Sequence, residues 1–384
     1  MKKIAVYCLT MLIILSSLTV TAFAESDTSL EIKAKAAVLM DASTGKVLYS
    51  HNEHERLYPA SVTKIMPLLL VMEAIDSGKI SLNDQVTVSA DAALKGGSQI
   101  WLEDGESMTV DEMLRAVAIA SANDACCALG EHISGSESAF VDLMNQRAKE
   151  LGMNDTHFEN CSGLDDDTET HLTSAYDIAV MSKELLKHEL IKKYSTVWMD
   201  SLRDGKTELV NTNKLVRFYN GTTGLKTGTT AKAGKCLSAS AERDGLHLVA
   251  VVLGSETSDD RFNTAKTLLN YGFANYETVE LQVDTDLITD VKVLKGIEES
   301  IKPTISEIGK VTLKKGDKDK ISTEITLATD VEAPVEEGQK LGNVVFKINN
   351  EPIGECDLFS DKNIRKIKYT DILMLMLKSL TTGQ

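Results

Sequence analysis

A serine and a lysine stand three residues apart at Ser61 and Lys64, in a stretch that begins with Pro59 and is otherwise mostly apolar. Residues three apart share one face of a helix, so the two side chains can meet if Pro59 starts a helix. A lysine amine can activate a serine nucleophile once its surroundings disfavour the ammonium form. The spacing therefore allows an acyl-transfer pair, but taken alone it also fits a helix cap and a solvated lysine.

A second candidate motif is Ser121-Ala-Asn123, which directly follows a helical pattern. Its hydroxyl can relay a proton, and its amide can hold a carbonyl or an N–H group of a substrate. Serine and asparagine are also common helix-capping residues, so this motif alone does not separate a site from a cap.

A third motif, Lys226-Thr227-Gly228-Thr229, lies in a segment rich in glycine and threonine. Gly228 would let a bound peptide approach the strand backbone closely. The lysine charge and the two threonine hydroxyls can bind a carboxylate. An ordinary strand with an exposed lysine would also fit these residues.

The elements before the first two motifs are a hairpin and two helices. Turn residues at 42–45 separate two short strand patterns at 35–41 and 46–51. The same Ser-x-x-Lys spacing recurs inside that turn, at 43 and 46, where we expect no catalytic role. Helical spacing then runs from about Ala60 to Gly78, and Pro67 predicts a bend near its start.

The second motif follows a helix that begins at a capping box formed by Thr109 and Glu112. Beyond the third motif, strand patterns at 236–241 and 247–253 precede a helix that Ser258 is expected to cap. The order strands, helices, strands, helix predicts an α+β fold, with one antiparallel sheet flanked by helices and carrying a helical insert. Short alternating patterns after Tyr276 predict a small C-terminal β domain.

The ends of the chain differ from its middle. Residues 1–24 combine two lysines, an apolar run and a final Ala-Phe-Ala, which predicts a secretory signal and an exported mature protein. We therefore divide the chain into a signal peptide at 1–24, a first domain at 25–275, a β-rich domain at 276–357 and a tail at 358–384. The tail is basic and carries six consecutive apolar residues at 372–377, which suits either a membrane interface or packing on the β domain.

Composition excludes several other classes of protein. The formal net charge of −16 disfavours nucleic acid as a partner. The five cysteines outside the signal have irregular spacing, which argues against a disulfide framework or a zinc ribbon and predicts buried apolar packing. We expect no metal site, and no metal or organic cofactor.

The three motifs, in this order, resemble those of the penicillin-interacting serine acyl-transferases. The surrounding sequences LMDASTGKVLYSHN, LGMNDTHFENCSGL and GLKTGTTAKAGKCLSASAERDGLHLVAVVLGS are similar to those of the D-alanyl-D-alanine carboxypeptidases, the low-molecular-weight penicillin-binding proteins. Similarity covers most of 35–276. The resemblance implies a β-lactamase/transpeptidase-like catalytic domain, peptidoglycan stem peptides as substrates and covalent inhibition by β-lactams.

The resemblance also implies a role for each motif. Ser61 would attack the carbonyl between two terminal D-alanines, Lys64 would accept its proton, Ser121 would relay a proton to the leaving group, and Asn123 would hold the peptide. The substrate carboxylate would be bound by Lys226, Thr227 and Thr229. Backbone N–H groups of Ser61 and Thr229 would form the oxyanion hole, and the tail would reach the outer face of the cytoplasmic membrane.

Three other functions were weighed against this one. A class A β-lactamase favours aspartate where this chain has Ala122, although Glu150 and Asn154 imitate the spacing of its deacylation motif. A zinc peptidase would need more than the pair His51 and His54, since no His-Glu-x-x-His is present. A non-catalytic wall-binding or penicillin-sensing module would be expected to lack the serine or lysine of the first motif, and both are present.

Overall fold

The computed structural model describes residues 30–382, so the predicted signal peptide lies outside the described residues. A five-stranded antiparallel sheet holds the third motif, in the order β2-β1-β9-β8-β7. Its strands come from both ends of the domain, as predicted: β1 Ala36–Asp41, β2 Val47–His51, β7 Thr222–Thr230, β8 Gly234–Arg243 and β9 Leu246–Ser255.

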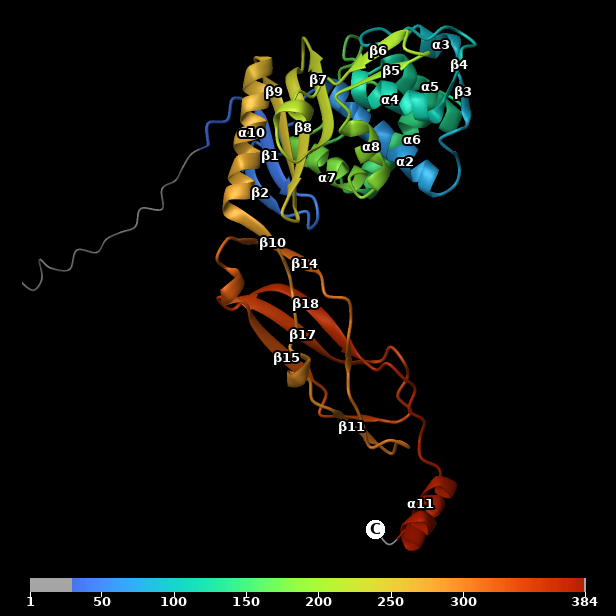
Figure 1. Cartoon of the computed structure of the whole chain (residues 1–384), viewed down its shortest axis with the longest axis vertical. Coiled ribbons are helices and arrows are strands. Elements are labelled where there is room, and N and C mark those ends of the chain that lie inside the picture. The colour runs from blue at the N-terminus through green and yellow to red at the C-terminus, as the bar shows by residue number, and fades with distance from the viewer. Residues whose placement is uncertain (1–29, 383–384) are drawn as a thin grey trace, which may run out of the picture. The chain divides into compact units, whose positions relative to one another are not determined.

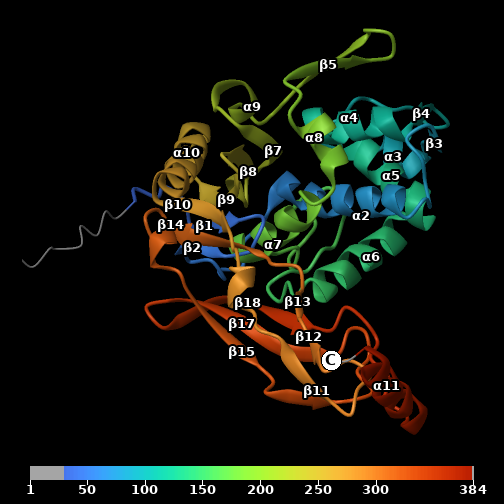
Figure 2. The same ribbon diagram turned by 60° about the horizontal axis from the view of Figure 1, so that its bottom comes forward.

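Helices cover both faces of this sheet (Figures 1 and 2). Helix α10, Ser258–Asn275, packs on β8 and β9 from one side, and α7, Ala175–Leu185, packs on β1 and β9 from the other. Strand β9 is therefore almost entirely buried, as expected for a strand covered on both faces. The N-cap of α10 is Thr257 rather than the expected Ser258, because the Thr257 hydroxyl accepts the backbone N–H of Asp260.

The predicted helical insert lies between β2 and β7. The capping box of Thr109 and Glu112 is present at the start of α4. The insert also carries two two-stranded sheets, β3-β4 and β5-β6. Its elements are η1 Ala60–Lys64, α2 Ile65–Asp76, β3 Gln85–Thr87, α3 Ala90–Ala93, β4 Ser107–Thr109, α4 Val110–Ala120, α5 Asn123–Ser134, α6 Glu137–Glu150, α7, η2 Glu189–Ile191, α8 Lys192–Ser195, β5 Met199–Leu202, β6 Thr207–Val210 and α9 Leu215–Phe218.

The first motif forms a 3₁₀ turn, η1, that leads directly into α2. The irregularity expected near Pro67 thus takes the form of a change in helix type at Ile65. Pro67 is the third residue of α2, where a backbone N–H would have no partner inside the α-helix, so the missing donor costs little. In a 3₁₀ turn residues three apart eclipse one another, which places Ser61 directly beside Lys64.

The predicted C-terminal β domain consists of short strands around two small apolar cores. Its three sheets have the orders β10-β14, β12-β11-β16 and β13-β18-β17-β15. The elements are β10 Tyr276–Glu280, η3 Thr285–Leu287, β11 Val291–Leu294, β12 Ser300–Ile301, β13 Thr304–Ile305, β14 Lys310–Lys314, η4 Lys318–Lys320, β15 Ser322–Leu327, β16 Asp330–Glu332, β17 Lys340–Ile348 and β18 Glu351–Phe359.

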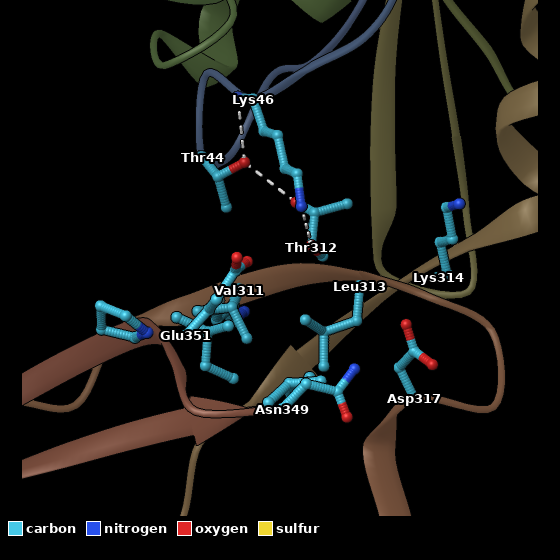
Figure 3. A pocket seen from close by; sticks show the side chains of 13 residues that line it. Thr44, Lys46, Val311, Thr312, Leu313, Lys314, Asp317, Asn349 and Glu351 are labelled. Carbon is cyan, nitrogen blue, oxygen red and sulfur yellow. Dashed lines mark hydrogen bonds between the residues drawn. The ribbon is translucent and has the colours of Figure 1, made fainter. Parts of the chain in front are cut away.

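The β1–β2 hairpin turn contacts β14 through polar groups (Figure 3). Thr312 exchanges a hydrogen bond of 2.9 Å with the Thr44 hydroxyl, and its carbonyl accepts a 3.0 Å bond from Lys46 Nζ. The Thr312 hydroxyl also bonds to the buried carboxylate of Asp41. The lysine of the second Ser-x-x-Lys spacing, Lys46, therefore belongs to a contact between the hairpin and the β domain.

The tail divides into two parts. Ile364 is fully buried and forms a bridge with Val335 of the β domain. The following helix α11, Tyr369–Thr382, exposes apolar side chains, including 81% of Tyr369 and 69% of Met374. Within 30–382, the structure contains no helix of the length and hydrophobicity needed to span a membrane.

Candidate active site

The serine and lysine of the first motif are in direct contact. Lys64 Nζ lies 3.0 Å from Ser61 Oγ and donates a 2.7 Å hydrogen bond to the carbonyl oxygen of Ser162. Lys64 is completely buried, whereas Ser61 is partly exposed. The solvated lysine that the sequence left open is therefore ruled out, and the amine is placed to take a proton from the hydroxyl.

Burial changes the proton affinity of this lysine and of Lys226. Desolvation lowers the pKa of Lys64 to about 8. Desolvation also lowers the pKa of Lys226 well below its ordinary value, and the charges of Lys64 and Arg261 lower it further. Two ammonium groups that are both buried and close together repel each other, so we expect the pair to hold fewer than two protons near neutral pH.

Strand β7 lies against the turn that carries Ser61. A Cβ atom added to Gly228 would lie 2.7 Å from the carbonyl oxygen of Pro59 and 3.0 Å from the Ser61 nitrogen. A glycine is therefore required for the strand to approach the turn so closely. The sequence suggested instead that this glycine makes room for a bound peptide.

The threonines of the third motif are held by neighbours that the sequence did not identify. Thr227 Oγ1 donates a 2.7 Å hydrogen bond to Thr212 Oγ1. Arg261 of α10 lies behind the strand, where Nη1 is 3.1 Å from the Gly228 carbonyl oxygen and 3.4 Å from Thr229 Oγ1. Arg261 is buried and carries no motif, so only the sheet packing reveals it.

The second motif lies at the junction of α4 and α5. Ser121 ends α4 in the left-handed region, at φ 66°, a conformation that costs energy for a residue with a side chain. Asn123 begins α5 and donates a 2.7 Å hydrogen bond from Nδ2 to the Gly96 carbonyl. Its Oδ1 atom is buried and has no hydrogen-bond partner in the described structure. This atom can therefore accept an N–H group of a bound peptide.

Two further residues connect the second motif to its surroundings. The buried carboxylate of Asp124 accepts the backbone N–H groups of Ile100 and Leu102, each at 3.1 Å, and so fixes the loop that supplies the Gly96 carbonyl. The thiol of Cys126, one turn into α5, bonds to the carbonyl oxygen of Cys161, next to Ser162. The start of α5 thus contacts the loop that holds Lys64. Within residues 30–382, Ser121 itself makes no direct hydrogen bond to the first or the third motif.

The residues that suggested other functions lie in different settings. Glu150 is exposed at the end of α6 and pairs with Arg147 at 3.3 Å, as a surface residue would. His54 pairs with Asp155 at 2.8 Å. Neither His51 nor His54 belongs to a group of three potential metal ligands in the described residues.

A buried lysine in contact with a partly exposed serine, beside an edge strand and with an unsatisfied amide oxygen on the helical insert, has the geometry that a serine acyl-transferase needs. The family model for D-alanyl-D-alanine carboxypeptidase matches residues 21–257. The model for the C-terminal domain of penicillin-binding protein 5 matches residues 276–366. The chain therefore belongs to the D-alanyl-D-alanine carboxypeptidase family of serine peptidases.

Individual relatives agree with this assignment. D-alanyl-D-alanine carboxypeptidase DacF of Bacillus subtilis (strain 168) is 45% identical and covers 94% of each chain. DacC of Escherichia coli (strain K12) is 36% identical over 90% of this chain and 88% of its own. The structure of penicillin-binding protein 5 from Haemophilus influenzae superposes with a TM-score of 0.77 at 31% identity, covering 88% of this chain and 98% of that one.

A further structural relative contains a ligand. Penicillin-binding protein D2 from Listeria monocytogenes, in its ampicillin-bound form, has a TM-score of 0.58 at 31% identity. The match covers 64% of this chain and 99% of that chain. The expected fold, a transpeptidase-like domain followed by a small β domain, is thus confirmed.

Proposed function

We propose that Ser61 is the nucleophile of this serine-type D-alanyl-D-alanine carboxypeptidase and that Lys64 is its general base. The 3.0 Å contact between Lys64 Nζ and Ser61 Oγ carries the proposal. The neutral amine takes the hydroxyl proton as Oγ forms a bond to the carbonyl carbon between the two terminal D-alanines of a stem pentapeptide. The C–N bond then breaks, the leaving amine receives a proton, and water hydrolyses the acyl-enzyme.

The second hydrogen bond of Lys64 supports this role. The Ser162 carbonyl accepts one N–H of the amine at 2.7 Å, in the neutral form and in the ammonium form alike. This fixed acceptor orients the amine toward Ser61 before the reaction and stabilises the positive charge that develops on it afterwards.

Lys226, Thr227 and Thr229 are proposed to bind the terminal carboxylate. A carboxylate beside Lys226 would raise the pKa of that lysine again, because an opposite charge favours the ammonium form. The restored charge on Lys226 would in turn oppose protonation of Lys64, because the charge of Lys64 disfavours the ammonium form of Lys226 and repulsion between two like charges is mutual. Substrate binding would therefore help to keep the general base neutral.

The remaining site residues complete the proposal. Backbone N–H groups of Ser61 and Thr229 would form the oxyanion hole, and each such donor is typically worth ~3 kcal/mol in acyl transfer. The close approach at Gly228 supports this arrangement because it places β7 beside the Ser61 nitrogen. Asn123 Oδ1 would accept a peptide N–H, and Ser121 would relay the proton to the departing D-alanine.

Substitution of the nucleophile tests this function directly. Ser61→Ala should abolish D-alanine release from a stem pentapeptide and covalent labelling by penicillin, as followed by mass spectrometry of the intact protein. The matched control is Ser43→Ala, which removes the serine of the second Ser-x-x-Lys spacing and should retain both activities. Labelling of the purified Ser61→Ala protein would show that the nucleophile lies elsewhere.

We also propose the domain division and location expected from the sequence: a signal peptide at 1–24, a catalytic domain at 25–275, a β-rich domain at 276–357 and a tail at 358–384. The mature protein would be exported, and its tail would lie on the outer face of the cytoplasmic membrane. The exposed apolar side chains of α11 and the basic residues before it support an interfacial helix.

A further inference from the structure

A second cluster of reactive side chains lies beside the loop that holds Lys64. It consists of Cys127 on α5, Cys161 in the loop and Glu137 at the start of α6, whose ligand atoms all lie within 4.8 Å of one another. Both cysteines are completely buried. The Cys161 thiol is 3.2 Å from Glu137 Oε1 and its backbone N–H is 3.3 Å from the same oxygen. None of these three residues has a role in the acyl-transfer mechanism.

A fourth potential ligand lies next to this group. Glu131, one turn after Cys127 on α5, places Oε1 at 3.7 Å from the Cys127 thiol. In a tetrahedral zinc site with bonds of roughly 2.0–2.3 Å, neighbouring ligand atoms are about 3.3–3.8 Å apart. The 3.2 Å between the Cys161 thiol and Glu137 Oε1 and the 3.7 Å between the Cys127 thiol and Glu131 Oε1 are close to that spacing, but Glu131 lies outside the group whose ligand atoms are all within 4.8 Å of one another.

The other oxygen of each carboxylate is already fixed. Glu131 Oε2 accepts a 2.7 Å hydrogen bond from the Ser89 hydroxyl, and Glu137 Oε2 pairs with Lys95 Nζ at 2.5 Å. Such outer contacts orient the ligands of metal sites. When both thiols are ionised, the two thiolates and the two carboxylates carry a charge of −4, and the positive charge of Lys95 reduces this to −3. A divalent cation is therefore still attracted.

The carboxylates of the cluster are reachable from solvent. A surface pocket of about 430 Å³ is lined by Lys95, Glu131 and Glu137. An ion that enters this pocket meets the Glu137 carboxylate first, and the two thiols that it must then reach are completely buried.

We propose that Cys127, Cys161 and Glu137 form a binding site for a thiophilic divalent cation such as Zn²⁺, with Glu131 as a neighbouring carboxylate. Binding displaces one proton from each thiol to water, and no bond of the substrate is involved. The metal is a structural one: it ties α5 and α6 to Cys161, whose neighbour Ser162 holds Lys64 through its carbonyl. The three ligands are positioning residues and do not touch the reacting atoms.

The test uses the full mature chain, reduced and stripped of metal, with Zn²⁺ alone as the probe. We expect one Zn²⁺ per chain, measured by elemental analysis after removal of free metal, and an increase in Tm when Zn²⁺ is added. Cys161→Ser should lose the bound ion, and Glu131→Gln should weaken binding less. Cys356→Ser removes a buried cysteine of the β domain and serves as the matched control that keeps full binding.

A second measurement does not depend on any variant being folded. Co²⁺ bound to the wild-type chain should show a thiolate charge-transfer absorption that added Zn²⁺ removes. No thiolate absorption, or equal Zn²⁺ binding by Cys161→Ser, would overturn the proposal. So would intact-mass data showing that Cys127 and Cys161 form a disulfide in the exported protein. Penicillin labelling of the same samples reports on the acyl-transfer function separately.

Discussion

Gly228→Ala tests whether the contact between β7 and the Ser61 turn sets the geometry of the reaction. The new Cβ would lie 2.7 Å from the Pro59 carbonyl oxygen and 3.0 Å from both the Ser61 nitrogen and the Ala60 Cβ atom. Three neighbours would then be closer than ordinary van der Waals contact, and two of them are backbone atoms. The strand and the turn must therefore move apart, by roughly half an ångström or more.

That displacement would separate the two proposed oxyanion donors, the N–H groups of Ser61 and Thr229. A misplacement of about 1 Å typically costs about 100-fold in rate, and the loss of one oxyanion donor costs about 100- to 1,000-fold. We therefore expect the acylation rate constant of Gly228→Ala to fall roughly 30- to 100-fold, which corresponds to about 2–3 kcal/mol of transition-state stabilisation.

Stopped-flow acylation with a fluorescent penicillin measures this rate constant, and Tm reports whether the variant is folded. Gly309→Ala is the matched control, because an added Cβ at that position meets nothing within 4 Å. The control should react like the wild type. If Gly228→Ala remains folded and acylates within about threefold of the wild-type rate, the strand contact does not set the geometry.

Three further predictions follow from the site and the tail. The second-order rate constant of acylation, measured at penicillin concentrations far below saturation, should rise about tenfold from pH 7 to pH 9, because a pKa of about 8 leaves Lys64 of the free enzyme mostly protonated at the lower pH and mostly neutral at the higher one; a flat profile would contradict Lys64 as the base. Asn123→Ala should lower kcat/KM for D-alanine release by roughly 10- to 100-fold, because the change removes a buried amide that holds the Gly96 carbonyl and is proposed to accept a substrate N–H; unchanged kcat/KM would exclude it from substrate binding. Deletion of 369–384 should abolish co-sedimentation with anionic vesicles and leave penicillin acylation unchanged; a deleted form that still sediments would show that α11 is not the anchor.

Much of the fold and of the site could be predicted because it depends on the types and spacing of side chains. Such patterns indicate the order of the three motifs, the hairpin turn, and the capping box of Thr109 and Glu112. The N-cap of α10 is Thr257, one residue before the expected Ser258, because threonine and serine are both common N-caps and only the backbone geometry shows which one caps the helix.

The rest depends on groups that leave no pattern in the sequence. The Ser162 contact to Lys64 is made by a backbone carbonyl, which every residue has. Arg261 lies on another element and meets β7 only after the sheet has formed. Cys127 and Cys161 are far apart along the chain, so their spacing resembles no known metal motif, and only the packing of α5 against the 160–164 loop brings them together.

The position of Arg261 behind β7 has a consequence for anion binding across the pH range. The charges of Lys64 and Lys226 are conditional, since burial lowers the pKa of both amines. A guanidinium stays protonated in proteins, and this one lies within hydrogen-bonding distance of Thr229 Oγ1. Burial lowers the pKa of Arg261 as well, but from a higher ordinary value. At a pH where both amines have lost their protons, a positive charge therefore remains behind the strand, and the affinity for anionic inhibitors should decline to a plateau rather than disappear.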